Sequence, residues 1–413
     1  MDYTSRGPTA GRKDAARAMR ILLHCDEYSP HWGPCTVRCK VFSDTFRQAG
    51  DHVTVLASST NLADGAQGDD NAIYCPTPAM KKKTALSRLG NNLGFALSSW
   101  IRSRKAGPAD VVITTSPPVL ASLAGWAIAR SKRARLVYDV RDVWPDVAVE
   151  IGSFAQGSLY YRVFKAITDF MLRHADAVTT VSPGKLKKLR EKLPPRDWDK
   201  LWLVENGLDE SFLQQPEDPE AVEKYGLEQR RTCVYIGNIG LAQGLEHFIR
   251  LAETADPEEY QFLLFGDGAE RRRLEQLAAD KGLEHVRFAG AVDSRTVLTV
   301  LRHAAMTYIP LVNANLKDSI PTKTYEAMGA GCPILMAAEG DAPALLAETG
   351  FGRSLSPNEI QRLPEVFRQF WEEYDSILAR REDAMRIALE IHSRQRIALR
   401  LEEDLRALAA RGK

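Results

Sequence analysis

The 413-residue chain is longer than one hydrophobic core usually serves, so its length favours two domains. Its composition, 44% hydrophobic and 26% charged, is that of an ordinary folded globular protein. The formal net charge of +1 argues against nucleic acid as the main partner, because a surface that neutralises several phosphates needs an excess of Lys and Arg.

Two features of the sequence indicate the cellular compartment: its possible targeting segments and the distribution of its cysteines. No uninterrupted apolar run is long enough to span a bilayer, and the N-terminal residues lack the apolar core of a secretory signal, so we expect a cytoplasmic protein. The cysteines are scattered, which favours reduced core thiols over a disulfide framework. They are Cys25, Cys35, Cys39, Cys75, Cys233 and Cys332. Although His24 and His31 lie near three of them, no second Cys pair completes a four-ligand set, and no metal site is predicted.

After a polar tail, residues 1–18, short apolar runs alternate with helical stretches. This pattern is typical of α/β proteins in which helices cover both faces of a parallel sheet. In the first half we expect strands at 20–25, 52–58, 110–116, 135–140 and 176–181. In the second half we expect them at 232–237, 260–266, 285–290, 305–310 and 332–337. The pattern predicts two doubly wound, Rossmann-like domains.

Composition suggests the domain boundaries. Residues 19–209 form the expected N-terminal domain and 210–390 the C-terminal domain, with a hinge in the acidic, proline-containing stretch 207–231. The amphipathic segment 391–413 is predicted to be a helix that crosses back to the first domain. Ligands of open parallel sheets bind beyond the carboxyl ends of the strands, so two such domains facing each other make a cleft.

Two glycine loops follow expected strands of the second half. They read GNIGLAQGLEHF, 237–248, and FGDGAERRRLEQL, 265–277. Glycines let the backbone approach a ligand closely, and the amides at a helix N-terminus favour anions, so both loops suit a phosphate. A tight turn that needs glycine for packing is the alternative, and in the second loop we prefer it for all residues except Gly266.

The stretch DSIPTKTYEAMGAGCP, 318–333, predicts a short helix that begins beside a proline. The hydroxyls of Thr322 and Thr324 could bond free amides in its first turn. Lys323 brings a cation to the positive end of the helix, which costs stability unless an anion such as a diphosphate lies there. A solvated surface lysine is the alternative. Glu326 follows on the same helix.

The order of these stretches resembles the nucleotide-sugar domain of retaining glycosyltransferases of family 4, which have the GT-B fold. The resemblance rests on YIGNIGLAQGLE, LFGDGAERRRLE, the VRFAG run, and Asp318 separated by seven residues from Glu326. In the first half Gly33, GDHVTVLAS, VSPG and ENGLD follow the family order, so the resemblance covers nearly the whole chain past residue 18. YDVRDVWPDVAVEIG, 138–152, resembles a bacterial branch that builds O-antigens, capsules and other surface polysaccharides, often with N-acetylamino sugars.

The resemblance implies roles for the donor-side residues. Glu326 would accept hydrogen bonds from the ribose hydroxyls, which suits acceptor-only oxygens. Asp318 would lie near the transferred sugar, with a helix or turn cap as the alternative. Where many members carry an Arg and a Lys, this chain has Asn238 and Gln243, which can bind phosphate oxygens without neutralising their charge. Lys323 would then carry most of the positive charge.

On the acceptor side, Gly33 would belong to the loop that faces the phosphates, where Pro34 replaces a second glycine and removes an amide donor. Arg141 and Asp142 lie just beyond an expected strand of the first half. We interpret Asp142 as a ligand of the acceptor hydroxyl or a base, and Arg141 as its orienting residue or a phosphate ligand. A structural ion pair beside a buried Trp144 is the alternative.

Taken together, the resemblance implies retaining transfer of a hexose or N-acetylamino sugar from a UDP-sugar, rather than a GDP-sugar, to a glycan or polyprenyl-linked acceptor. No metal ion or other cofactor would be required. The segment 80–105 is amphipathic with basic ends, so it could contact an anionic membrane at the inner face of the cell membrane, or simply pack on the sheet. The alternative functions are a UDP-sugar 2-epimerase-like isomerase and an inactive scaffold of a polysaccharide assembly complex.

Overall fold

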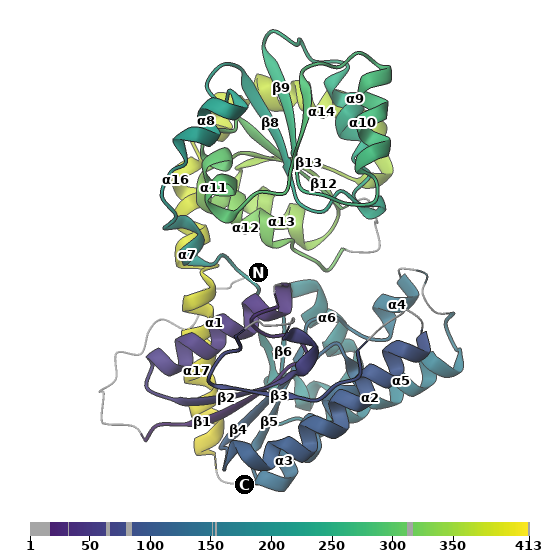
Figure 1. Cartoon of the computed structure of the whole chain (residues 1–413), viewed down its shortest axis with the longest axis vertical. Coiled ribbons are helices and arrows are strands. Elements are labelled where there is room, and N and C mark those ends of the chain that lie inside the picture. The colour runs from purple at the N-terminus through teal and green to yellow at the C-terminus, as the bar shows by residue number, and fades with distance from the viewer. Residues whose placement is uncertain are drawn as a thin grey trace.

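The computed structural model describes residues 17–411, except 32, 63–66, 80–84, 151, 153–154 and 312–316. Almost all of the expected tail 1–18 and the first residues of 80–105 therefore lie outside the described residues. Two α/β domains are stacked along the long axis of the molecule, each built on one parallel sheet (Figure 1). The predicted architecture of two domains, each with one doubly wound parallel sheet, is confirmed.

The first sheet has seven parallel strands in the order β3-β2-β1-β4-β5-β6-β7. They are β1 (Arg20–His24), β2 (His52–Ser58), β3 (Ala72–Cys75), β4 (Val111–Ser116), β5 (Arg135–Val140), β6 (Ala177–Thr180) and β7 (Leu201–Leu203). Its helices are α1 (Pro34–Gln48), α2 (Ala85–Arg102), α3 (Val119–Lys132), α4 (Asp146–Glu150), α5 (Leu159–His174) and α6 (Pro183–Lys192). The strand order reverses between β1 and β4, where a doubly wound sheet opens a crevice at its carboxyl edge.

The second sheet has six parallel strands in the order β10-β9-β8-β11-β12-β13. They are β8 (Arg231–Ile236), β9 (Tyr260–Phe265), β10 (Val286–Gly290), β11 (Met306–Pro310), β12 (Ile334–Ala337) and β13 (Gly352–Leu355). The helices that follow the first domain are α7 (Glu210–Leu213), α8 (Pro219–Tyr225), α9 (Glu246–Ala252), α10 (Arg271–Asp280), α11 (Ser294–His303), α12 (Thr322–Ala330), α13 (Asp341–Thr349), α14 (Leu363–Glu372), α15 (Tyr374–Leu378), α16 (Arg381–Glu390) and α17 (Arg394–Ala410). Here the order reverses between β8 and β11.

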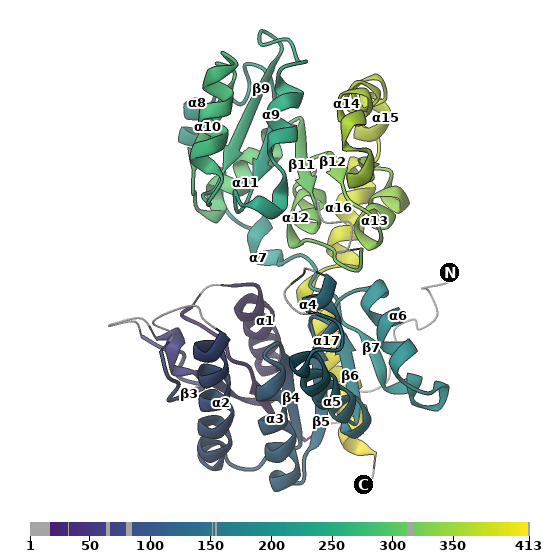
Figure 2. The same cartoon turned by 90° about the vertical axis from the view of Figure 1, so that its right-hand side faces the viewer.

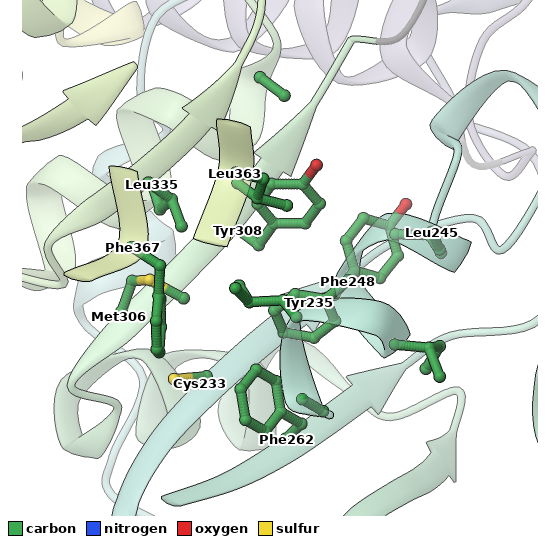
Figure 3. Packing of buried hydrophobic residues seen from close by; sticks show 14 of the residues in the cluster. Cys233, Tyr235, Leu245, Phe248, Phe262, Met306, Tyr308, Leu335, Leu363 and Phe367 are labelled. Atoms are coloured by element: carbon green, nitrogen blue, oxygen red, sulfur yellow. The ribbon is translucent and has the colours of Figure 1, made fainter. Parts of the chain in front are cut away.

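Each sheet is buried on both faces, because its strands are nearly continuous apolar runs. In the first domain α1 and α17 cover one face, while α2, α3, α5 and α6 cover the other (Figure 2). In the second domain aromatic residues fill the space between sheet and helices, and the rings of Phe248 and Tyr308 stack with centroids 5.1 Å apart (Figure 3). Tyr235 belongs to the same core, which gives the loop after β8 a rigid base.

The chain crosses between the domains twice, and the two crossings are bonded together. Leu208 pairs with Ser393 in an isolated parallel bridge, and its amide donates to the carbonyl of His392 at 2.7 Å. α17 then packs against α1 of the first domain (Figure 1). The buried pair Arg38–Asp139, 2.9 Å, supports the first crossing, since Arg38 also donates to the carbonyl of Glu205. The buried Arg38–Asp139 ion pair therefore stabilises the first crossing between the domains.

Much of the stretch 207–231, expected as a hinge, folds as α7 and α8, and Ala221 and Tyr225 of α8 lie in the core of the second domain. All six cysteines are free and buried, as predicted. Among the described residues there is no group of three or more His, Cys, Asp or Glu that could hold a metal ion. In the same part of the chain no helix is both long and apolar enough to span a membrane.

Candidate active site

Two glycine loops meet at the carboxyl edge of the second sheet. Gly237 follows β8 and Gly266 follows β9, with φ of +144° and +125°, backbone angles that favour glycine. A Cβ atom on Gly266 would overlap the carbonyl oxygen of Gly237, so the close approach of the loops alone requires glycine there. A Cβ on Gly237 would lie 2.8 Å from the Nζ of Lys323. The absent side chain at Gly237 therefore leaves room for that ammonium group.

Lys323 extends from the first turn of α12 beneath these loops. Its Nζ lies 4.6 Å from the centroid of the Tyr235 ring, a cation–π contact. Burial lowers the pKa of Lys323 to about 8, although the nearby Glu326 raises it. Among the described residues no carboxylate lies within ion-pair distance of Lys323, and its side chain is half-buried rather than a fully solvated surface lysine. The structure therefore holds a partly desolvated cation without an ion-pair partner in the described chain.

Glu326 lies one helical turn after Lys323 on α12. Burial raises its pKa, while Arg394 at the start of α17 and Lys323 act in the opposite direction. Within the described part of the chain its carboxylate makes no hydrogen bond. Both its oxygens are thus able to accept bonds from neighbouring hydroxyls.

The two amides that replace cations converge over the loop after β8. A Cβ on Gly240 would lie 2.7 Å from the Nδ2 of Asn238 and 3.0 Å from the Oε1 of Gln243. The Oε1 of Gln243 is buried without a partner, whereas the side chain of Asn238 is exposed. The hydroxyl of Tyr235 donates to the carbonyl of Asn238 at 2.7 Å, so the tyrosine beneath Lys323 also fixes the loop.

The N-terminus of α12 differs from the expectation in one respect. Pro321 is its capping residue, and among the described residues neither Thr322 nor Thr324 caps a free amide with its hydroxyl. The Oγ1 of Thr324 is instead buried without a partner. The capping prediction for Thr322 and Thr324 was wrong, because the proline places both threonines inside the helix rather than before it.

Asp318 lies between the two domains and is held from α6. Lys185 donates to its carbonyl at 2.7 Å and to its Oδ1 at 3.3 Å. Lys188 reaches its Oδ2 at 2.8 Å, and the hydroxyl of Ser182 donates to the same carbonyl at 2.6 Å. Burial would raise the pKa of Asp318, but Lys185 and Lys188 outweigh it and the pKa is lowered. We name Ser182, Lys185, Lys188 and Asp318 the Asp318 latch.

The latch was not anticipated from the sequence. Lys185 is 3% exposed and stands in the first turn of α6, where Ser182 caps the helix through the amide of Lys185. The amide of Gly184 donates to the Oδ2 of Asp341 at 2.8 Å, a second bond across the same interface. The available signal was VSPGK, a capping serine, a proline and a lysine directly after a strand.

At the carboxyl edge of the first sheet, Arg141 donates to the carbonyl of Pro117 at 2.6 Å, and its Nε is buried without a partner. Asp142 is 43% exposed and lies 3.9 Å from the Nζ of Lys185. In the described residues Arg141 and Asp142 form no ion pair with each other, so the structural pair considered as an alternative is absent. Through Lys185, Asp142 stands next to the latch.

Gly33 caps α1 in an extended conformation, φ −173°, that any residue could adopt. A Cβ there would lie 3.3 Å from the Oε2 of Glu27 and 3.7 Å from the Nε2 of His31. Asp26, two residues after the end of β1, was overlooked in the sequence: its Oδ1 is buried without a partner. Burial raises the pKa of Asp26 to about 6 although Arg141 lowers it. An acid that follows the first strand was the signal.

Comparisons with known proteins agree with this geometry. Residues 37–207 match the glycosyl transferase 4-like domain and residues 217–386 match glycosyl transferases group 1. The chain is 24% identical to the probable glycosyltransferase WbjE of Pseudomonas aeruginosa, over 71% of this chain and 74% of that protein. It is also 24% identical to the putative colanic acid biosynthesis glycosyl transferase WcaI of Escherichia coli, over 85% and 92%.

Solved structures show the same fold. Sucrose-phosphate synthase of Thermosynechococcus elongatus superposes with a TM-score of 0.76 at 17% identity, covering 95% of this chain and all of that one. Anabaena HepE in complex with UDP gives 0.71 at 16% identity, covering 94% and 100%. The protein is therefore of the GT-B class. Both domain models match in order, and together with the relatives they support a glycosyltransferase of the family 4 type.

Proposed function

We propose that this protein transfers a hexose or N-acetylamino sugar from a UDP-sugar to a hydroxyl of a glycan or polyprenyl-linked acceptor, with retention of anomeric configuration. One observation carries the proposal: Lys323 and Glu326, both half-buried and without hydrogen-bond partners in the described chain, lie one turn apart below two glycine loops. A cation and a carboxylate that lose part of their hydration without pairing are costly unless a ligand uses them.

A nucleoside diphosphate matches these two groups. The ammonium group of Lys323 would neutralise the charge that develops on the leaving diphosphate, in a buried site where such an interaction is strong. Glu326 would accept the ribose hydroxyls. Around them Gly237 and Gly266 would let the diphosphate approach the backbone, Asn238 and Gln243 would add amide hydrogen bonds to phosphate oxygens, and Thr322 and Gly33 would contact the donor from the two domains. No metal ion is needed in this scheme.

On the opposite side, Asp142 would bind the acceptor hydroxyl and Arg141 would orient it or hold an acceptor phosphate. The departing phosphate would accept the hydroxyl proton on the same face of the sugar. Asp318, committed to Lys185 and Lys188, acts here as a positioning residue: the latch fixes the distance between Asp142 and the donor helix α12.

The relatives support a UDP-sugar donor and a role in polysaccharide synthesis, but they do not assign either to this chain. HepE has been solved with UDP and with UDP-glucose, and WcaI is named for colanic acid biosynthesis. We propose a role in bacterial surface polysaccharide synthesis at the inner face of the cell membrane. In the described part of 80–105, α2 exposes Leu93, Leu97 and Trp100, which favours a peripheral contact with an anionic membrane.

A thermal-shift screen of UDP, UDP-sugars and GDP-sugars tests the donor site, because a ligand that binds only the native state raises the melting temperature. We expect UDP compounds to stabilise the protein, and the absence of any shift with UDP and GDP compounds would contradict the proposal. Incubation with UDP-N-acetylglucosamine alone separates the alternatives, since an epimerase would change the sugar. An inactive scaffold would release no UDP even with acceptor.

A further inference from the structure

The ammonium group of Lys185 lies between carboxylates of the two domains. In the described chain its hydrogen bonds all reach the second domain: the carbonyl of Asp318 at 2.7 Å, the Oδ1 of Asp318 at 3.3 Å and the Oγ of Ser319 at 3.0 Å. Asp142 of the first domain lies 3.9 Å from the same Nζ, too far for a hydrogen bond. A lysine has three N–H donors, so the second domain accepts all of them in this arrangement.

Withdrawal of the second domain would leave Lys185 with Asp142 as its nearest carboxylate. Among the described residues, Asp318 and Asp142 are the carboxylates within ion-pair distance of Lys185. The side chain of Asp142 is 43% exposed and makes no hydrogen bond in that part of the chain, so it is free to turn. A shift of about 1 Å would bring it to the distance of a charge-assisted hydrogen bond. Separation of the domains is therefore expected to pair Lys185 with Asp142.

The segment that follows Asp142 is held by α6 and does not depend on the second domain. Lys192 pairs with Asp146 at the start of α4 at 2.6 Å, and Lys188 pairs with Glu150 at its end, also at 2.6 Å. Both lysines belong to α6, and α4 and α6 lie at the end of the first domain that faces the second (Figure 2). Asp142 would thus stay beside α6 in either arrangement of the domains.

Close approach of the domains depends on Gly184, directly before Lys185. Its amide donates to the Oδ2 of Asp341 at 2.8 Å. A Cβ atom at Gly184 would lie 2.8 Å from the Cβ of Asp318 and 3.0 Å from its Cα. Backbone atoms cannot turn away as the end of a long side chain can. The substitution Gly184→Ala would therefore push Asp318 away from Lys185 without altering either charge.

We propose that Lys185 exchanges Asp142 for Asp318 when the two domains close, and that this exchange releases Asp142 to bind the acceptor hydroxyl. The inference rests on the proposed function, in which Asp142 is the acceptor ligand and the donor contacts both domains. In the separated state the ammonium group of Lys185 holds the carboxylate of Asp142. In the closed state Asp318 and Ser319 accept the hydrogens of that group, and the oxygens of Asp142 are open to a hydroxyl. Lys185 is thus a positioning residue, and closure around the donor precedes productive binding of the acceptor.

Zero-length cross-linking with a water-soluble carbodiimide reports the exchange, because the reagent joins an amine directly to a carboxylate that lies against it. The isopeptides of Lys185 with Asp142 and of Lys188 with Asp318 are quantified by mass spectrometry in the full chain without UDP. We expect Gly184→Ala to lower the product of Lys188 with Asp318. It should raise the product of Lys185 with Asp142 about tenfold, the shift in equilibrium that loss of one charge-assisted bond produces.

The matched control is Gly90→Ala in α2. Gly90 is also a helical glycine, but its Cβ would meet nothing within 4 Å, so both products should stay unchanged. The isopeptide of Lys192 with Asp146 is the internal standard, because both residues belong to the first domain and neither contacts Asp318.

Asp318→Asn is the second variant, because it removes the competing carboxylate without crowding the interface. The product of Lys185 with Asp142 should rise there as well. A purely structural tie between the domains would lose its link to Asp318 without gaining one to Asp142. An unchanged yield of the Asp142 product in both Gly184→Ala and Asp318→Asn would therefore overturn the exchange.

UDP separates this inference from the donor site. In the wild-type protein UDP should lower the product of Lys185 with Asp142, because the ligand closes the domains, and Gly184→Ala should resist this change. Stabilisation by UDP without a fall in that product would overturn the order in which the donor binds first. Absence of any thermal shift with UDP would instead overturn the donor site, whereas the comparison of variants without UDP decides the exchange by itself.

Discussion

One buried lysine, Lys185, and one half-buried lysine, Lys323, lie in opposite domains near the cleft, and their surroundings differ. Lys185 of α6 is saturated: it bonds to the carbonyl and carboxylate of Asp318 and to the hydroxyl of Ser319 at 3.0 Å. Lys323 of α12 rests on an aromatic ring and has no bonded partner in the described chain. Lys185, whose hydrogen bonds are made within the protein, holds the two domains together, whereas Lys323 lacks such bonds and is available to bind a ligand.

The largest effect on stability is expected when the bonds between Lys185 and Asp318 are broken. Lys185→Met leaves the carboxylate of Asp318 buried with one cation fewer, so we expect the free energy of unfolding to fall by about 3 kcal/mol. Denaturation of the UDP-free protein measures it. The double variant Lys185→Met, Asp318→Asn should lose less than the sum of the single changes, because the two groups interact. UDP affinity should change little, and a loss as large as that of Lys323→Met would refute the comparison.

Replacement of the unpaired Lys323 should have the opposite effects, a loss of UDP affinity and a gain in the stability of the UDP-free protein. Lys323→Met removes the cation that faces the diphosphate, so we expect UDP affinity to fall roughly 50- to 100-fold, the worth of a strong charge-assisted bond. Calorimetric titration measures it. The UDP-free protein should become more stable by roughly 1–3 kcal/mol, because a desolvated charge is removed. Asn238→Ala is the control, with a loss of about threefold; the reverse order would show that Lys323 is not the main phosphate ligand.

Glu326→Gln tests the partner of Lys323. We expect UDP to bind about tenfold more weakly, since an amide offers one acceptor oxygen where the carboxylate offers two. The wild type should prefer UDP to 2′-deoxy-UDP, and the variant should lose that preference. Equal loss for both nucleotides would mean that Glu326 acts through Lys323 and not on the ribose.

The smallest effect is a pH dependence. The native pKa of Lys323, about 8, lies below the unfolded value of 10.5. UDP needs the charged form, so its affinity should fall about five- to tenfold between pH 7 and pH 9, and Lys323→Met should show no such fall. Below pH 8 the lysine is charged in both states and its burial penalty is complete. From pH 8 to 10.5 the native state loses the proton first, and this group destabilises the protein less. A flat affinity profile in the wild type would contradict the assignment.

The central strands and one edge strand, β10, were predictable from the sequence, whereas the other three edge strands were not. All ten expected strands are present within one or two residues at each end. The three that were missed, β3, β7 and β13, each lie at an edge of a sheet and have only three or four residues. A central strand is buried on both faces and must be apolar, whereas an edge strand is short and less constrained, so its pattern is weak.

On the candidate site, local sequence identified residues but not their partners. The loops at Gly237 and Gly266 and the cation Lys323 lie together as expected, because parallel strands bring their carboxyl ends to one edge. Asp318 was expected near the sugar, and nothing local indicated that Lys185, distant in the chain, would take both its carbonyl and its carboxylate. Asp26 and its unpartnered oxygen were likewise not evident until the fold placed β1 and β5 on either side of β4.

The sequence by itself determined the two parallel-sheet domains, their order and the helix that carries Lys323 and Glu326, because apolar periodicity, glycine turns and proline helix starts act over a few residues. Only the tertiary structure decided which charges are satisfied. The pairing of Lys185 and Lys188 with Asp318 and the lack of a bonded partner for Lys323 depend on how elements far apart in the chain meet. An unpaired charge becomes costly only when that packing removes it from water.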